Sequence, residues 1–412
     1  MLATSGMAAA PGASQADVVI LNTCTVTAAA DEDVRQVVRR VHRENPEAQI
    51  LVTGCYAQRA PEELAGMPGV AWVVGNSHQA QIPSLLFEAG PTPCHGQIHV
   101  GDIFAQQEFL AAPVGEGAGD RTRPNLKIQD GCNQRCSFCI IPFVRGRGRS
   151  APPDQVVEQV RALGRKYREV VLSGINLGRW GREPGLRMRL AGLLRRLLAE
   201  TGVERLRLSS VEPMDFSDEL LALMAESPRM ARHVHAPLQT GSDSVLRRMH
   251  RRYRPRHYAD RILKARALMP DAAIGADVMA GFPGETEREF EENRRFIESL
   301  PFTYLHVFTY SERPGTPAAA APDQVPMRVR KQRNRILRDL AAGKNLAFRE
   351  SMLGRTLSVV TLERERIALS GNYLKVELAA PRAANRLVEV EVDAVTPAGL
   401  RERNPLAVLS GS

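Results

Sequence analysis

The first hundred residues alternate short apolar runs with a segment of helical periodicity. The runs 16–23, 50–53 and 70–74 have the length and composition of strands buried in a parallel sheet. Between the first two runs, the valines of 34–41 recur at i, i+3, i+4 and i+7, which places them on one face of a helix. The pattern predicts an α/β domain of the order β-α-β-α-β over residues 1–105.

A second and longer series of strands and helices follows a segment rich in glycine and proline. Residues 107–124 have the composition of a linker. Strands are expected after it at 126–129, 169–173, 205–209, 233–237, 273–279 and 304–308. Helices are expected at 154–166, 186–200, 287–300 and 327–340. Six such units predict a partial (β/α)6 barrel over residues 118–346, with its active residues at the carboxyl ends of the strands by analogy with the eight-unit barrel.

The last stretch, residues 348–412, changes to the pattern of an all-β domain. Apolar and β-branched residues alternate or cluster at 357–362, 373–378 and 387–392, between turn signals. We expect a small β-barrel there.

Composition adds the number of domains and the kind of partner. A chain of 412 residues, 43% of them hydrophobic and 25% charged, is long enough for two or three buried cores. No stretch has the length and apolarity of a membrane span or a signal peptide, so we expect a cytoplasmic protein with no membrane partner. The net charge of +9 favours a polyanionic partner. Two arginine-rich runs, at 247–256 and 328–338, make nucleic acid the favoured one.

Three cysteines form the most specific motif of the chain. Cys132, Cys136 and Cys139 have the spacing C-x3-C-x2-C, with no fourth cysteine nearby. A 4Fe-4S cluster takes four thiolates, so three would leave one iron open to another ligand. A zinc site is the alternative, but structural zinc needs a fourth ligand, for which Cys94 and His95 in a Pro-rich stretch are poor candidates. Disulfides are disfavoured in a cytosolic chain.

Two further cysteines follow predicted strands of the first domain. Cys24 ends the first strand and Cys55 ends the second. Right-handed crossovers place the carboxyl ends of parallel strands on one edge of the sheet, so we expect both thiols on the same rim. Two buried structural thiols are the alternative, because cysteine is often buried without a ligand. The position at a ligand-binding edge favours a shared metal site.

Longer motifs surround these cysteines and the predicted strand ends. They are Asn-Thr-Cys-Thr-Val-Thr (22–27), Gly-Cys-Tyr-Ala-Gln (54–58), Leu-Lys-Ile-Gln-Asp-Gly-Cys-Asn (126–133), Cys-Ile-Ile-Pro-Phe-Val-Arg-Gly-Arg (139–147), Pro-Leu-Gln-Thr-Gly-Ser-Asp (237–243) and Gly-Phe-Pro-Gly-Glu-Thr (281–286). With the order of the domains, they resemble the methylthiotransferase family of radical S-adenosylmethionine enzymes over nearly the whole chain. The resemblance implies that the first domain is a methylthiotransferase N-terminal domain, the second a radical S-adenosylmethionine domain, and the third a TRAM domain.

The resemblance also implies cofactors. Cys132, Cys136 and Cys139 would hold a 4Fe-4S cluster whose open iron binds S-adenosylmethionine, and Cys24 and Cys55 would hold two corners of a second, auxiliary 4Fe-4S cluster. Barrel geometry places five small or polar residues at strand ends around S-adenosylmethionine: Ser173, Gly174, Ser209, Glu212 and Gln239.

The substrate implied by the resemblance is tRNA. The Thr-Val-Thr after Cys24 is similar to the branch that adds a methylthio group to C2 of N6-threonylcarbamoyladenosine in the tRNA anticodon stem-loop. An electron donor such as flavodoxin or ferredoxin is implied as a second partner. The alternatives are a relative that acts on isopentenyladenosine in tRNA or on a ribosomal-protein side chain, and an RNA-binding module with a structural cluster.

One expectation concerns a missing element. Family members begin with a strand that ends in a first auxiliary cysteine, yet the strand before Cys24 is the first one recognisable here. In a sheet of flavodoxin-like order the first strand is central, so we expect its loss to leave a gap in the sheet. We therefore expect the sequence to start late by about 30 residues, one β-α unit, and the auxiliary cluster to lack a ligand, for which Cys94 is a poor substitute.

Overall fold

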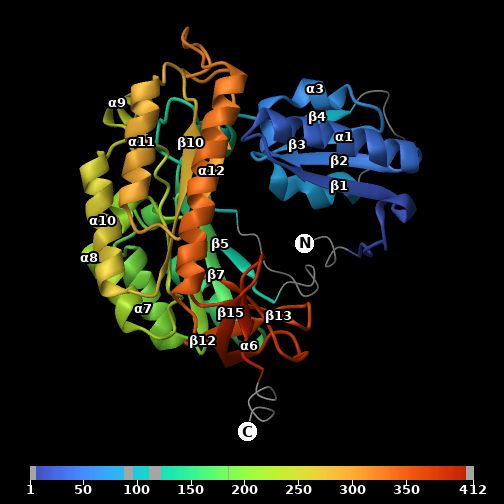
Figure 1. Ribbon diagram of the computed structural model, residues 1–412. Coiled ribbons are helices and arrows are strands. Elements are labelled where there is room, and N and C mark those ends of the chain that lie inside the picture. The colour runs from blue at the N-terminus through green and yellow to red at the C-terminus, as the bar shows by residue number, and fades with distance from the viewer. Residues whose placement is uncertain (1–5, 88–95, 111–121, 184, 405–412) are drawn as a thin grey trace. The chain divides into compact units, whose positions relative to one another are not determined.

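The computed structural model contains two compact units (Figure 1) and describes residues 6–87, 96–110, 122–183 and 185–404. Unit 1 consists of residues 1–110, 131–149 and 311–321. Unit 2 consists of residues 111–130, 150–310 and 322–412. The predicted linker 107–124 lies mostly outside the described residues, as do Cys94 and His95.

Unit 1 is a parallel sheet with helices. Its strands, in spatial order, are β1 (Val18–Thr23), β2 (Gln49–Gly54), β3 (Val70–Gly75) and β4 (Gln97–His99). Its helices are α1 (Ala28–Glu44), α2 (Cys55–Arg59), α3 (Pro61–Ala65), α4 (Ile82–Phe87) and α5 (Ile141–Arg145), with short 3-10 turns at Ala13–Gln15, Gln79–Gln81 and Ile103–Ala105. The three predicted strands and the helix after the first are confirmed. The continuous apolar runs of β2 and β3 form strands because both faces of the sheet are covered.

The expectation of a gap in this sheet is wrong. Residues 18–23 of β1 pair in register with 49–54 of β2, and the order β1-β2-β3-β4 is unbroken. Strand β1 pairs directly with β2, with no space for a missing central strand between them, and the four strands follow one another in space in chain order.

Unit 2 contains a partial barrel of parallel strands. These are β5 (Asn125–Asp130), β7 (Glu169–Gly174), β8 (Arg205–Leu208), β9 (His233–His235), β10 (Ala273–Ala280) and β11 (Tyr304–Thr309), with the short β6 (Arg149–Ser150) beside β5. The two sheets join where the Val211 N–H donates to the His235 carbonyl over 3.0 Å. All six predicted strands are confirmed.

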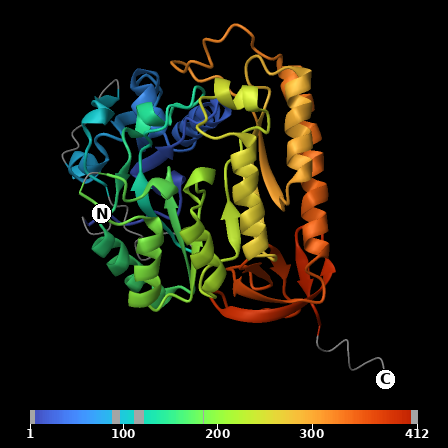
Figure 2. The same ribbon diagram turned by 90° about the vertical axis from the view of Figure 1, so that its left-hand side faces the viewer.

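Helices lie along the outer side of these strands (Figures 1 and 2). They are α6 (Pro153–Lys166), α7 (Leu190–Glu200), α8 (Asp218–Glu226), α9 (Asp243–Arg248), α10 (Pro255–Leu268), α11 (Glu287–Ser299) and α12 (Met327–Glu350), with 3-10 turns at Leu177–Arg179 and Pro213–Asp215. Four of them match the prediction, and α12 continues ten residues beyond it. The sequence did not indicate α8, α9 and α10.

The C-terminal part of unit 2 is a closed β-barrel, as predicted. Its strands are β12 (Thr356–Thr361), β13 (Ile367–Ser370), β14 (Lys375–Glu377), β15 (Leu387–Val395) and β16 (Leu400–Glu402), in the closed order β12-β13-β14-β16-β15. Alternate residues of these strands, such as Val359, Val376 and Val392, fill its core. None of the helices within the described residues is long and apolar enough to cross a membrane.

Candidate functional site

The three-cysteine loop belongs to unit 1 and begins where β5 ends. Gly131 has a positive φ of 70°, and a side chain there would collide with the Arg147 backbone. The Cys132 N–H donates to the Gly146 carbonyl over 3.0 Å, which closes residues 132–146 into one loop. Cys136 is buried, whereas Cys132 and Cys139 are half-buried. The loop thus presents three thiols from a segment that its own backbone constrains.

Backbone N–H groups point at the sulfurs of Cys132 and Cys24. The Gln134 N–H points at the Sγ of Cys132 over 3.4 Å, and the Val26 N–H at the Sγ of Cys24 over 3.5 Å. Hydrogen bonds to cysteine sulfurs are among the features that tune iron–sulfur clusters. The donor set of the loop therefore fits a 4Fe-4S cluster.

Cys24 and Cys55 follow directly on paired strand residues. Thr23 is opposite Gly54 in the register of β1 and β2, so the two cysteines come next on neighbouring strands, as expected from the sequence. Gly54 has a positive φ of 100°, and a side chain there would meet the Thr23 carbonyl. Glycine is required at this close approach of the two strand ends.

The Cys55 sulfur is held by two side chains that sequence reasoning missed. The Nε of Arg145 lies 3.1 Å from it and the Nδ2 of Asn76 lies 3.6 Å from it. Asn76 also donates to the Val144 carbonyl over 2.7 Å, and Val144 packs against Cys55. Helix α5, which ends the three-cysteine loop, therefore supplies an arginine to the second cysteine site of the same unit.

A buried ion network holds the segment after Cys24. The Thr25 hydroxyl donates to Asp31 over 2.6 Å, and the same carboxylate accepts from Arg313 over 2.6 Å and from Arg59 over 2.9 Å. Asp31 and Arg313 are both buried. Arg313 comes from residues 311–321, which complete unit 1 from nearly three hundred residues away in the sequence.

The five residues expected around S-adenosylmethionine lie at the carboxyl ends of unit 2 strands. Ser173 and Gly174 end β7, Ser209 follows β8, Glu212 precedes the turn 213–215, and Gln239 follows β9 with a positive φ of 66°. A side chain in place of Gly174 would lie 2.8 Å from the Gln129 Cβ, so glycine is required there. The position of the cofactor stays a prediction.

Glu212 differs from the other four because a buried arginine binds it. Burial raises the pKa of Glu212, and the guanidinium of Arg251, which is hydrogen-bonded to it, opposes the rise. Arg251 was expected on a tRNA-binding surface, yet it is buried. Glu212 is therefore a structural partner of Arg251 in this fold.

The arginine runs divide into buried and exposed members. In α12, Arg330 and Arg333 are buried; Arg333 pairs with Glu285 over 2.8 Å. The exposed members of the two runs are Arg247, Arg252, Arg256, Arg328, Lys331, Arg335 and Arg338. Arg248 and Arg254 are half-buried, with 38% and 39% of their side chains exposed, so a polyanion can reach them as well as this exposed subset.

An interior cavity of about 300 Å³ lies inside the strands of unit 2. Residues from β5, β7, β8, β9, β10 and β11 line it, together with Tyr373 from the turn between β13 and β14. The Tyr304 hydroxyl lies 2.7 Å from Nε2 of His233 and 2.8 Å from Nδ1 of His235. Tyr373 stacks on His233 at 4.5 Å between ring centroids, so the C-terminal barrel closes one side of this cavity.

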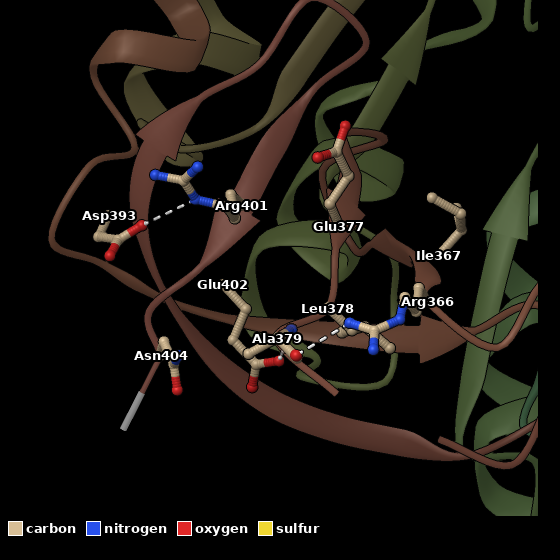
Figure 3. Close-up of a pocket in the computed structure, with 9 residues that line it drawn as sticks. All are labelled: Arg366, Ile367, Glu377, Leu378, Ala379, Asp393, Arg401, Glu402 and Asn404. Atoms are coloured by element: carbon tan, nitrogen blue, oxygen red, sulfur yellow. Dashed lines mark hydrogen bonds and ion pairs between the residues drawn. The ribbon is translucent and has the colours of Figure 1, made fainter. Parts of the chain in front are cut away.

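A second pocket lies on the C-terminal barrel (Figure 3). Carboxylates and guanidiniums both line it: Glu377, Asp393 and Glu402 face the same space as Arg366 and Arg401. Arg366 donates to the Ala379 carbonyl over 3.1 Å. Mixed charge of this kind gives no preference for a phosphate backbone.

Comparison with known proteins assigns the family. The radical SAM superfamily matches residues 126–297, and the uncharacterized protein family UPF0004 matches residues 1–75. A solved structure, the radical S-adenosylmethionine methyltransferase TsrM from Kitasatospora setae with cobalamin and a [4Fe-4S] cluster bound, shares the fold with a TM-score of 0.56 at 16% identity, over 74% of this chain and 66% of that one. The fold and the superfamily match together assign the chain to a class of protein, the radical S-adenosylmethionine proteins.

Two relatives narrow the assignment. The chain is 38% identical to a threonylcarbamoyladenosine tRNA methylthiotransferase MtaB of Aquifex aeolicus, over 91% of this chain and 90% of the relative. It is 36% identical to a tRNA-2-methylthio-N(6)-dimethylallyladenosine synthase of Nocardioides sp., over 89% of this chain and 74% of the relative. The chain belongs to the methylthiotransferase family of radical S-adenosylmethionine enzymes. Iron–sulfur and S-adenosylmethionine cofactors follow from this membership.

Proposed function

We propose that this enzyme converts N6-threonylcarbamoyladenosine beside the tRNA anticodon to its 2-methylthio derivative. The observation that carries the proposal is the 38% identity to the Aquifex aeolicus enzyme over nine-tenths of both chains. Isopentenyladenosine in tRNA is the competing substrate, because the dimethylallyladenosine synthase matches over a similar span of this chain. An RNA-binding module with a structural cluster is disfavoured, since such a cluster needs no open iron.

The five described cysteines divide between two proposed 4Fe-4S clusters. Cys132, Cys136 and Cys139 would hold one, and Cys24 and Cys55 would contribute to the other. When bound and reduced, the first supplies the electron that cleaves S-adenosylmethionine to a 5′-deoxyadenosyl radical, and the second supplies the sulfur that is methylated and transferred.

The protein side chains prepare these sites in specific ways. Arg145 donates a hydrogen bond to the Cys55 sulfur over 3.1 Å and so fixes the position of that sulfur. The network of Thr25, Asp31 and Arg313 fixes the backbone beside Cys24. Water is kept from Cys55 by Ile140 and Val144, which pack on it.

The remaining partners and boundaries are part of the proposal. We propose S-adenosylmethionine contacts at Ser173, Gly174, Ser209, Glu212 and Gln239. We also propose three functional domains over residues 1–105, 118–346 and 348–412. The two compact units cut across these boundaries, because the three-cysteine loop packs in unit 1. A flavodoxin or ferredoxin would supply the electrons, and a tRNA substrate would place the enzyme in the cytoplasm.

Mass spectrometry of tRNA nucleosides tests the proposal. A strain that lacks the gene should lose the 2-methylthio derivative of N6-threonylcarbamoyladenosine and accumulate its precursor. Complementation with the gene should restore the product. Loss of 2-methylthio-isopentenyladenosine instead would assign the competing substrate.

A further inference from the structure

The floor of the interior cavity of unit 2 has more positive charge than its own carboxylate neutralises. Glu169 is fully buried and accepts from Arg207 over 2.7 Å, Arg123 over 2.9 Å and Arg205 over 3.4 Å. Three guanidiniums therefore share one carboxylate. Arg123 and Arg207 line the cavity, and Arg123 is 24% exposed. Buried charge is costly unless it is paired, so this floor favours an anionic ligand group.

Arg123 is oriented to bind such a group. Only its Nη1 is engaged, by Glu169, and the rest of its guanidinium has no hydrogen-bond partner within the described ranges. Arg207, by contrast, also donates to the carbonyls of Gly371 and Ser370 over 3.1 and 3.0 Å. The hydrogen bond to Glu169 engages Nη1, so other N–H groups of this cavity-lining guanidinium are left for a carboxylate.

The wall of the same cavity offers neutral hydrogen-bonding groups and one carboxylate. Asp277 Oδ1 lies 3.2 Å from Nε2 of His235 and 3.2 Å from Nδ1 of His306. Burial raises the pKa of Asp277, but the hydrogen bonds from the two imidazoles outweigh it and hold the pKa well below its usual range. Asn125 and Ser210 also line the cavity and add an amide and a hydroxyl. The wall can thus accept N–H groups and bind hydroxyl or carbonyl oxygens.

The volume of the cavity and its access from solvent fit a single polar substituent. The cavity of about 300 Å³ is at the small end of ligand pockets, enough for a branched group and the edge of a base. His306 is 51% exposed, so the wall is reachable from solvent. The threonylcarbamoyl group carries a carboxylate, a hydroxyl and urea N–H groups, which match the floor and the wall. An isopentenyl group has none of these.

We propose that this cavity receives the N6 substituent of the substrate adenosine, and that Arg123 and His306 select threonylcarbamoyl over isopentenyl. The inference rests on the proposed function and deepens it. An isopentenyl group would remove water from Arg123 and Asp277 without offering either side chain a hydrogen bond in its place. A site built on hydrogen bonds rejects an analogue that lacks them by factors of about 10⁴–10⁵ in the strongest cases, and loss of one charge-assisted bond corresponds to about 10–100-fold.

Binding of synthetic RNA tests the inference without requiring turnover. Three anticodon stem-loops, with N6-threonylcarbamoyladenosine, N6-isopentenyladenosine or adenosine beside the anticodon, are titrated by fluorescence anisotropy into the full chain. The variants are Arg123→Gln and His306→Leu. The control is Arg366→Gln, which removes a guanidinium from the pocket of Figure 3 instead. Circular dichroism verifies the fold of each variant.

The unsubstituted enzyme should bind the threonylcarbamoyl RNA more tightly than the isopentenyl RNA. Arg123→Gln should lower this ratio of affinities about 10–100-fold. His306→Leu should lower it in the same direction, so the test holds even where Arg123→Gln perturbs its Glu169 partner. Arg366→Gln should leave the preference unchanged. A preference that survives both cavity variants would overturn the inference while the proposed function stands. A preference of the unsubstituted enzyme for the isopentenyl RNA would overturn both.

Discussion

Replacing the buried Glu169 by glutamine should destabilise unit 2 far more than loss of an ordinary surface pair. Burial raises the pKa of Glu169, but the guanidinium of Arg207, followed by Arg123 and Arg205, outweighs it and holds the pKa at about 2, against an ordinary value of 4.5. That difference corresponds to about 3 kcal/mol of stability. Removing one partner of a buried ion pair costs about 3–5 kcal/mol, which agrees in size.

Scanning calorimetry measures the effect. At neutral pH the Glu169→Gln variant should unfold about 6–20 °C below the unsubstituted protein, taking 3–5 kcal/mol at 2–4 °C per kcal/mol. The matched control is Glu204→Gln, since Glu204 pairs with Arg168 at the surface with 40% and 38% of the two side chains exposed. Such pairs contribute about 0–1 kcal/mol.

The pH dependence has a defined sign. Because the folded pKa of Glu169 is lowered, its contribution is complete above the unfolded value of about 4.5 and is lost as pH falls towards about 2. The difference between the Gln variant and the unsubstituted protein should therefore be constant from pH 7 to 5 and about 1 kcal/mol smaller at pH 3.5. Equal shifts for Glu169→Gln and Glu204→Gln, or a difference independent of pH, would refute this account of the cavity floor.

Three further predictions concern the cysteine sites and the basic surface. Cys136→Ala should abolish formation of 5′-deoxyadenosine after anaerobic reconstitution, as followed by chromatography; undiminished formation would exclude a cluster held by this loop. Arg313→Ala should loosen the segment beside Cys24 by about 1–3 kcal/mol and speed alkylation of that thiol by iodoacetamide severalfold, measured by mass spectrometry, whereas an unchanged rate would mean that the network does not hold the segment. Substitutions of an exposed and a buried arginine should have different effects. Arg252→Gln should reduce the slope of log binding constant against log salt concentration for tRNA by about one. Arg251→Gln should instead lower the unfolding temperature. The same effect of both substitutions on the salt dependence and the unfolding temperature would contradict the division of residues 247–256 into exposed and buried arginines.

Periodicity predicted the strands well because their environment is uniform. Strands β7 and β10 are mostly apolar over six and eight residues and are largely buried, so hydrophobicity and length alone identify them. Helix α10 was missed because its apolar face is narrow: Tyr258, Ile262 and Ala265 are buried among many charged residues. Strands β13 and β16 were missed because four and three residues are too short for a period to be recognised.

The candidate site was predictable only where its members are close in sequence. The spacing of three cysteines in eight residues indicates a metal centre without any knowledge of the fold. The arginine that binds Cys55 is ninety residues away from it, and Arg313 is 282 residues from Asp31. Which of two neighbouring arginines in a basic run is buried depends on tertiary packing, and charge alone does not decide it.

The discontinuous make-up of unit 1 has a consequence for how the chain matures on the ribosome. Domains usually fold in the order of their synthesis, at about 5–20 residues per second. Unit 1 is completed by residues 311–321, and the roughly 200 residues between 110 and 311 take about 10–40 s to translate. During that interval Asp31 lacks Arg313, and the thiol of Cys24 stands on an unfinished segment. The nascent N-terminal region is therefore a target for chaperones until residues 311–321 have been made, because the Asp31–Arg313 pair can form only then.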